Sequence, residues 1–108
     1  MAMAYLKSLG YRVLERNVRN KAGEIDIVAR DKGTLCFIEV KTRRTARFGS
    51  PFEAITPRKR RKLIRLAEMY LQDKNIASTN IRFDCVAVFV EEPKDSQITL
   101  IKGAFEVE

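Results

Sequence analysis

Two carboxylates and one lysine in the first half of the chain have the types and spacing of side chains that act on phosphate esters: Asp26, Glu39 and Lys41. Two facing carboxylates repel each other unless a positive charge lies between them, and a hard divalent cation such as Mg²⁺ prefers oxygen ligands of this kind. Lys41 follows Glu39 by two residues, so both project from the same face of a strand. An ammonium group beside a metal-bound water suits the hydrolysis of a phosphodiester bond.

A predicted β-hairpin positions these three residues. The runs 23–30 and 35–41 alternate with period two and are rich in β-branched and aromatic residues. Lys32-Gly33, between the two runs, is typical of a two-residue hairpin turn. The hairpin is therefore the element that must bring the acids together.

The register of this hairpin decides whether the acids meet. A two-residue turn pairs residues whose numbers add up to 65, which places Asp26 opposite Glu39 and Glu24 opposite Lys41. Facing Cβ atoms are then about 5 Å apart, close enough for the two carboxylates to share one ion. A three-residue loop would instead place Asp26 opposite Val40 and separate the pair. A solvated strand face with an ordinary ion pair is the alternative interpretation of these residues.

The faces of the hairpin predict how it is covered. Strict alternation puts Ile25, Ile27 and Ala29 on one face and Asp26 and Val28 on the other. The face with Asp26 is apolar near the turn and polar at its far end. This pattern predicts a strand covered by a helix along most of its length and open to a cleft at one end.

Composition bounds the class of protein. A chain of 108 residues with 45% hydrophobic residues fits one globular domain over residues 1–108, and the order of the predicted helices and strands indicates the α/β class. It has no apolar run long enough to cross a bilayer, and we expect a soluble, cytoplasmic protein with no membrane partner. Cys36 and Cys85 lie in apolar runs and are expected to be buried, reduced thiols. The absence of histidine excludes imidazole-based triads and histidine metal sites.

The positive charge is concentrated in one segment. The whole chain has a net charge of +7, whereas residues 41–65 alone contain ten basic residues and one acid. The rest of the chain is therefore slightly acidic, and a polyanion is expected to lie across the basic segment. A solvated basic face, acidic lipid and an acidic protein partner are the alternatives to nucleic acid. The predicted phosphate contacts are Arg43, Arg44, Arg47, Arg58, Lys59 and Lys62.

The remaining pattern predicts helices and strands around the hairpin. Thr56 is a suitable N-cap and Pro57 suits the first turn of a helix that runs to about Asp73. Asp84, at the start of a continuous apolar strand, is interpreted as structural. A loop with little periodicity is expected over residues 42–51. The other predicted elements are a short helix over 1–9 and strands over 11–18, 81–90 and 97–101.

Short motifs spread over nearly the whole chain resemble those of a nuclease superfamily. They are Gly10-Tyr11, Leu14-Glu15-Arg16-Asn17, Gly23-Glu24-Ile25-Asp26, Glu39-Val40-Lys41-Thr42-Arg43, Gly49-Ser50-Pro51, Glu53-Ala54, Thr56, Lys59, Ala67, Tyr70-Leu71 and Arg82-Phe83-Asp84. Together with the order of the elements, they resemble the PD-(D/E)xK superfamily. Within it, the chain is most similar to the YraN-like family of predicted endonucleases, which is related to archaeal Holliday-junction resolvases.

This resemblance implies a fold and a set of roles. It implies a restriction-endonuclease-like core, in which a mixed central β-sheet is flanked by α-helices. Asp26, Glu39 and the main-chain carbonyl of Val40 would bind Mg²⁺ or Mn²⁺, and Lys41 would orient or activate the attacking water. Glu24 is expected to support the site, either through a contact behind the metal ligands or through an ion pair with Lys41.

Two functions follow from the resemblance and the charge pattern. The first is a metal-dependent endonuclease acting on DNA, with branched DNA as a candidate substrate and a homodimer as a candidate assembly. The second is a nucleic-acid-binding module without catalysis. The resolvases use a glutamate of a longer first helix, and this chain, which starts at Met1, has no counterpart of that acid.

Overall fold

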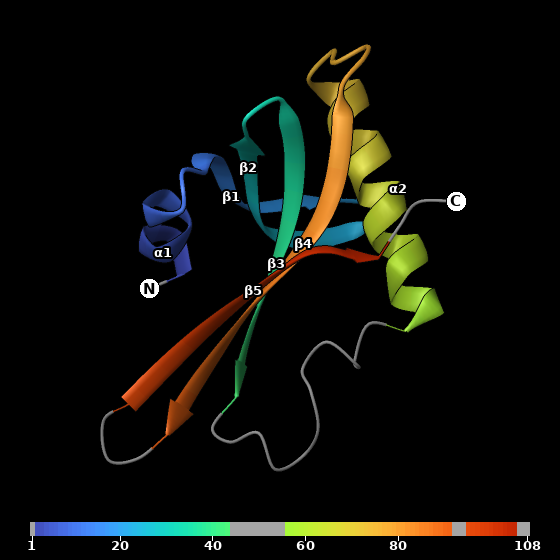
Figure 1. Cartoon of the computed structure of the whole chain (residues 1–108). Helices are drawn as coiled ribbons and strands as arrows, with labels where there is room; N and C mark the ends of the chain where they lie inside the picture. The colour runs from blue at the N-terminus through green and yellow to red at the C-terminus, as the bar shows by residue number, and fades with distance from the viewer. Residues whose placement is uncertain (1, 44–55, 92–94, 106–108) are drawn as a thin grey trace.

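A computed structural model describes residues 2–43, 56–91 and 95–105 (Figure 1). Five strands form one sheet in the order β1-β2-β3-β4-β5, in which β3 and β4 are parallel and the other neighbours antiparallel. The two helices lie on opposite sides of this sheet (Figure 1). The predicted mixed sheet flanked by helices is therefore confirmed. In chain order the elements are α1 (Ala2–Ser8), β1 (Arg12–Asn20), β2 (Gly23–Asp31), β3 (Thr34–Arg43), α2 (Pro57–Asp73), β4 (Asn80–Glu91) and β5 (Asp95–Phe105).

Local signals fix the hairpin turn and the long helix as predicted. Lys32 adopts a left-handed backbone with φ of 58°, and Asp31 pairs with Thr34 across the two-residue turn. At the start of α2, the hydroxyl of Thr56 accepts a hydrogen bond of 3.2 Å from the backbone N–H of Lys59. Helix α2 begins at Pro57 and ends at Asp73, which confirms both predicted ends.

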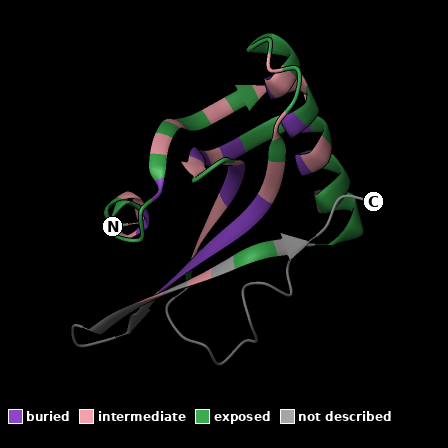
Figure 2. Ribbon diagram, turned by 45° about the horizontal axis from the view of Figure 1, so that its top comes forward, coloured by how far each residue is buried: buried purple, intermediate pink, exposed green. Residues whose placement is uncertain are grey.

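The core consists of two apolar clusters, one on each face of the sheet. Buried residues lie mainly in the central strands (Figure 2). Helix α2 packs Leu66 and Tyr70 against one face, where Phe37 of β3 is almost fully buried. Helix α1 packs Leu6 against the other face, where Ile38 of β3 is fully buried. Residues of β3 alternate between the clusters as a strand covered on both faces should.

Strand β2 does not keep the strict alternation that the sequence predicts. Ile25 and Val28 pack in the α2 cluster, whereas Ile27 packs in the α1 cluster. The expected common face for Ile25 and Ile27 is therefore wrong. The alternation changes at Asp26, and Asn17 of β1, which lies opposite, has a left-handed backbone with φ of 53°. This irregularity of both strands coincides with the first of the candidate acids.

Other boundaries differ from the prediction in the C-terminal strands and the basic loop. Residues 42 and 43 continue β3, so the predicted loop is wrong at these two positions, and residues 44–51 lie outside the described residues. Strand β5 extends over 95–105, longer than predicted. Residues 83–88 of β4 are all buried, and β4 lies between β3 and β5. No described helix combines the length and apolar character that a membrane span requires.

Candidate functional site

The β2–β3 ladder has the predicted register but ends just before the candidate acids. Its last pair is Ile27 with Ile38, and the expected pairs of Asp26 with Glu39 and of Glu24 with Lys41 are absent from the ladder. The expectation of directly facing acids is therefore wrong, because the two strands part at this point.

Where the β2–β3 ladder ends, the side chain of Asp26 replaces a backbone acceptor. The backbone N–H of Val40 donates a 2.7 Å hydrogen bond to Oδ2 of Asp26. The carboxylate thus supplies an acceptor to a main-chain donor that has left the ladder, which would otherwise cost free energy when buried. This contact ties Asp26 to the residue that follows Glu39.

Glu39 lies on the α2 side of β3 and has two cationic partners. Its Oε1 is 3.1 Å from Nζ of Lys41 and also contacts Nζ of Lys59, from the first turn of α2. The Glu39 side chain is 14% exposed, and its Oε2 is buried without a hydrogen-bond partner among the described residues. We call Asp26, Glu39, Lys41 and Lys59 the carboxylate–lysine cluster.

The pKa values of Asp26 and Lys59 are each affected by the charges of other members of the cluster. Burial raises the pKa of Asp26, against the lowering effect of the Val40 N–H, and the negative charges of Glu39 and Glu24 raise it further. Burial lowers the pKa of Lys59, but its hydrogen bond to Glu39 and the charges of Glu39 and Asp26 outweigh this, so the pKa is raised.

The residues present fit a magnesium ion better than a softer metal. No group of three or more His, Cys, Asp or Glu residues gathers as a metal site within 2–43, 56–91 and 95–105. Mg²⁺ is commonly held by one or two carboxylates, with waters and phosphate oxygens completing its shell. A buried carboxylate oxygen such as Oε2 of Glu39, which has no partner in the described part of the chain, is costly unless a positive group lies beside it. Asp26 and Glu39 are the side chains that would hold the ion.

Glu24 does not take its predicted place beside Lys41. It forms a 3.2 Å ion pair with Arg19 of β1, in which the two side chains are 41% and 77% exposed. The expectation of a pair with Lys41 is wrong because β2 has left β3 before this position. Glu24 still affects the cluster, since its charge contributes to the raised pKa of Asp26.

The predicted phosphate contacts fall into three groups. Arg58 and Lys62 are exposed on α2, and Arg43 is in the last position of β3. Arg44 and Arg47 lie outside the described residues. Lys59 differs from Arg58 and Lys62 because it turns toward the sheet and contacts Glu39.

A signal for this contact was present in the sequence. Lys59 lies four residues before Leu63 and so belongs to the helical stripe that buries Leu63, Leu66 and Tyr70. A cation on the buried stripe of a helix needs an anion on the surface beneath it. That requirement distinguishes Lys59 from the basic residues on either side.

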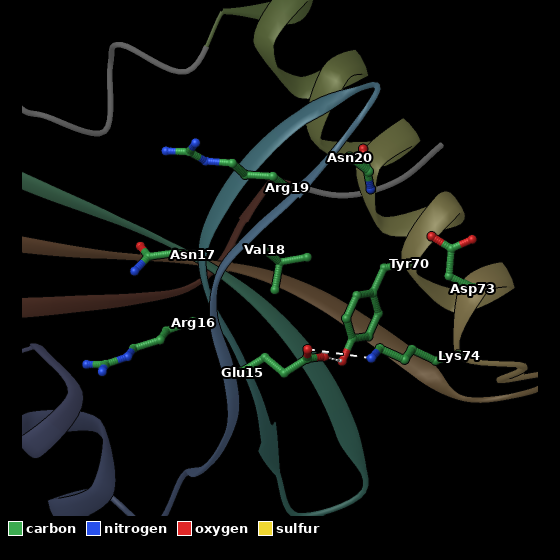
Figure 3. Close-up of a pocket in the computed structure, with 9 residues that line it drawn as sticks. All are labelled: Glu15, Arg16, Asn17, Val18, Arg19, Asn20, Tyr70, Asp73 and Lys74. Atoms are coloured by element: carbon green, nitrogen blue, oxygen red, sulfur yellow. Dashed lines mark hydrogen bonds and ion pairs between the residues drawn. The ribbon is translucent and has the colours of Figure 1, made fainter.

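Two hollows flank β1. One adjoins the carboxylate–lysine cluster on its α1 side, and its lining includes Asp26, Val40, Arg16 and Asn17. The other lies between β1 and the end of α2 (Figure 3). There Glu15 accepts a hydrogen bond from the hydroxyl of Tyr70 and lies 3.5 Å from Nζ of Lys74, which gives this carboxylate a structural role.

The burial and hydrogen bonds of Asp84 confirm that its role is structural. It is 2% exposed, and it accepts hydrogen bonds from the hydroxyl of Tyr11, the guanidinium of Arg82 and the backbone N–H of Gly103, at 2.8–2.9 Å. Arg82 also pairs with Asp31 at 2.8 Å, and Lys102 reaches the same oxygen at 3.2 Å. We call Tyr11, Asp31, Arg82, Asp84 and Lys102 the arginine network.

The fold and the site define a small α/β protein that presents a carboxylate–lysine cluster where two strands of a mixed sheet part. The chain belongs to the uncharacterised protein family UPF0102, whose model matches residues 1–88. It is 49% identical to a UPF0102 protein of Syntrophus aciditrophicus over 107 residues, which cover 99% of this chain and 84% of that protein. A UPF0102 protein of Geobacter sulfurreducens is 47% identical with the same coverage. One of Clostridium botulinum is 45% identical, covering 99% of this chain and 89% of the relative.

Proposed function

We propose that this protein is a Mg²⁺-dependent endonuclease that hydrolyses phosphodiester bonds of DNA on a restriction-endonuclease-like core. The observation that carries the proposal is Oε2 of Glu39, which is buried without a partner among the described residues. Oε1 of the same carboxylate faces two ammonium groups, and the charge of Glu39 acts on Asp26. Oxygen ligands beside lysine are suited to holding a hard cation and a phosphate at one place. Mn²⁺ would serve as a substitute ion.

The chain's own residues have distinct roles in this proposal. Asp26 and Glu39 would hold the ion, which would act as a Lewis acid and lower the pKa of a bound water. Lys41, 3.1 Å from Glu39, orients the attacking water beside the phosphate. The water oxygen bonds to phosphorus, the bond from phosphorus to one sugar oxygen breaks, and that sugar oxygen receives the proton that the water loses.

The basic residues near the cluster would bind the DNA backbone. Arg58 and Lys62 are exposed on the first turns of α2, whose N-terminal N–H groups and dipole also favour an anion. Arg43 extends β3 two residues beyond Lys41. The side chains of Arg58 and Lys62 would contact the phosphate backbone and make binding steeply dependent on salt. A homodimer would present two such sites to the two strands of a branched DNA.

A binding module without catalysis is the second candidate function. The observation that favours it is that Glu39 already pairs with Lys41 and Lys59, so the charge of its carboxylate is balanced without a metal. Asp26 also has a main-chain partner in Val40. This candidate predicts salt-dependent DNA binding that a chelator does not change, with no cleavage.

A cleavage assay separates the two candidates. Supercoiled plasmid and a four-way junction are incubated with Mg²⁺ or with chelator, and the wild type is compared with Asp26→Ala and Lys41→Ala. The endonuclease proposal predicts Mg²⁺-dependent cleavage that falls by about 100-fold or more in both variants, the usual scale for a lost acid–base group. Lys21→Gln, an exposed lysine of the β1–β2 turn, is the control for a lost charge. Equal cleavage in all four proteins would reject the proposal.

A further inference from the structure

We propose that Lys59 is an exchangeable counter-ion of the metal site: it pairs with Glu39 in the metal-free protein and transfers to a DNA phosphate when a divalent cation occupies the carboxylate. This inference rests on the proposed function and adds a positioning residue to it. It assigns to Lys59 a role different from that of the exposed basic residues on the same helix.

The geometry anchors the backbone of Lys59 and leaves its side chain a path to solvent. The N–H of Lys59 is capped by the hydroxyl of Thr56 at 3.2 Å, within the first turn of α2. The side chain spans from the helix to Oε1 of Glu39 and is 32% exposed. A lysine stem has several rotatable bonds, so the ammonium can move without any change in the helix.

The charges of the cluster require one ammonium group to withdraw when a cation binds. Asp26 and Glu39 carry two negative charges, and Lys41 and Lys59 carry two positive ones, so the cluster is neutral as it stands. A dication bound to Glu39 would lie within a few ångströms of both ammonium groups, at a partly buried place where like charges repel strongly. Binding of the dication is therefore coupled to release of a lysine.

Exposure indicates that Lys59, and not Lys41, is released. The Lys41 side chain is 18% exposed and comes from β3, beside Glu39 itself, whereas the Lys59 side chain is 32% exposed and comes from the helix above. The released ammonium would join Arg58 and Lys62 on the exposed face of α2, where the DNA backbone is proposed to lie. Lys59 thus neutralises the charge of Glu39 when no metal is bound, and the charge of a DNA phosphate when the metal is bound.

Metal affinity tests this exchange directly. Titration calorimetry with Mn²⁺ compares the wild type with Lys59→Gln, and with Lys62→Gln as the matched control, an exposed lysine one turn further along α2. Removal of a competing cation predicts that Lys59→Gln binds Mn²⁺ about tenfold more tightly, since contacts between full charges are the strong ones. Lys62→Gln is expected to stay within about twofold of the wild type, as a screened, exposed charge.

DNA binding gives a second readout that a purely structural ion pair would not change. Fluorescence anisotropy measures the affinity for a four-way junction, in chelator and in Ca²⁺ as a non-cleaving probe ion. In chelator Lys59 pairs with Glu39, so Lys59→Gln should bind DNA like the wild type. In Ca²⁺ Lys59→Gln should bind about fivefold more weakly than the wild type, and Lys59→Arg should restore most of the loss.

The outcomes separate this inference from the proposed function. If wild type binds Mn²⁺, loses it in Asp26→Asn, and Lys59→Gln binds with the same or weaker affinity, the exchange is overturned and the metal site stands. If DNA binding by Lys59→Gln is weakened equally in chelator and in Ca²⁺, Lys59 is a plain phosphate contact and the exchange is again overturned. If wild type binds no Mn²⁺, both the metal site and the exchange are overturned.

Discussion

The carboxylate–lysine cluster and the arginine network contain the same charges but differ in how those charges are satisfied. Each has two carboxylates and two cations, and each includes one aspartate of β2, Asp26 in the first and Asp31 in the second. In the arginine network, both oxygens of the buried Asp84 accept hydrogen bonds. In the carboxylate–lysine cluster, a buried oxygen of Glu39 has no described partner.

This difference indicates which cluster serves stability and which serves binding. A guanidinium presents a fixed fork of donors, and Arg82 uses it to join Asp84 to Asp31 across the sheet. Lysine ammonium groups are mobile point charges, and two of them lie at one oxygen of Glu39. A satisfied network rigidifies a fold, whereas an incomplete one retains capacity for a ligand.

The largest effect on stability is expected from the arginine network. Asp84→Ala removes the acceptor of Arg82 and Tyr11 from a fully buried position, and should destabilise the fold by about 3–5 kcal/mol. Lys102→Gln, which removes a half-exposed partner of Asp31, should cost less than about 1 kcal/mol. Denaturant unfolding measures both. A loss under about 1 kcal/mol for Asp84→Ala would contradict the distinction between the clusters.

The carboxylate–lysine cluster should give the opposite result. Asp26→Asn removes the charge but keeps an oxygen that can accept the Val40 N–H, so the free energy of unfolding should change by no more than about 1 kcal/mol. DNA cleavage should fall by about 100-fold, because a metal ligand has lost its charge. Unfolding and plasmid cleavage are measured on the same preparation. Activity that survives Asp26→Asn would count against the site.

The two aspartates of β2 should respond to pH with opposite signs. The pKa of Asp26 is raised above its ordinary value near 3.8, mainly by burial, so its contribution to stability is present below that value and is lost as pH rises through the folded pKa. The pKa of Asp31 is lowered by its hydrogen bond to Arg82, so its contribution is present above 3.8 and is lost as pH falls through the folded pKa.

Unfolding of the metal-free protein between pH 3 and 7 checks these signs. At neutral pH, Asp31→Asn should be less stable than the wild type, and Asp26→Asn equal or more stable. Both differences should shrink toward the acid end of the range, where the wild-type aspartates become protonated. Parallel pH profiles for the two variants would refute the opposite environments assigned to these residues.

The smallest effect is expected at the ion pair between Glu24 and Arg19. Its side chains are largely exposed, so Glu24→Gln should change the free energy of unfolding by less than about 0.5 kcal/mol. High salt should abolish even that difference. Thermal unfolding at low and high salt is the measurement. A large loss would place Glu24 among the residues that hold β2 in position.

The hairpin and α2 were predictable because their signals are local. The Lys32-Gly33 turn fixed the register of five consecutive pairs, and Thr56 with Pro57 fixed the start of the helix. The separation of β2 from β3 was not predictable. It accompanies a left-handed backbone at Asn17 of β1, which no pattern in the neighbouring sequence indicates. Period-two reasoning therefore failed at the residue of greatest interest, Asp26.

The arginine network could be predicted only in part. The apolar surroundings of Asp84 predict a structural role, but they do not identify its partners, which are Tyr11 just before β1, Arg82 of β4 and Gly103 of β5. Asp31 of β2 joins the network through Arg82. Lys59 was predicted to bind phosphate, whereas the structure places it on Glu39. Its place on the buried stripe of α2 was the available signal.

The hydrogen bond from the Val40 N–H to Asp26 has a consequence for how this site would decay in evolution. A descendant that no longer cuts DNA would still need an acceptor at position 26 to complete its backbone, so drift would favour asparagine there over most other residues. The ion pair of Lys41 is with the side chain of Glu39, so this contact satisfies no main-chain group. An oxygen acceptor at position 26, whether aspartate or asparagine, therefore does not distinguish an active relative from an inactive one, whereas loss of the negative charge there or of the lysine at position 41 would indicate lost catalysis.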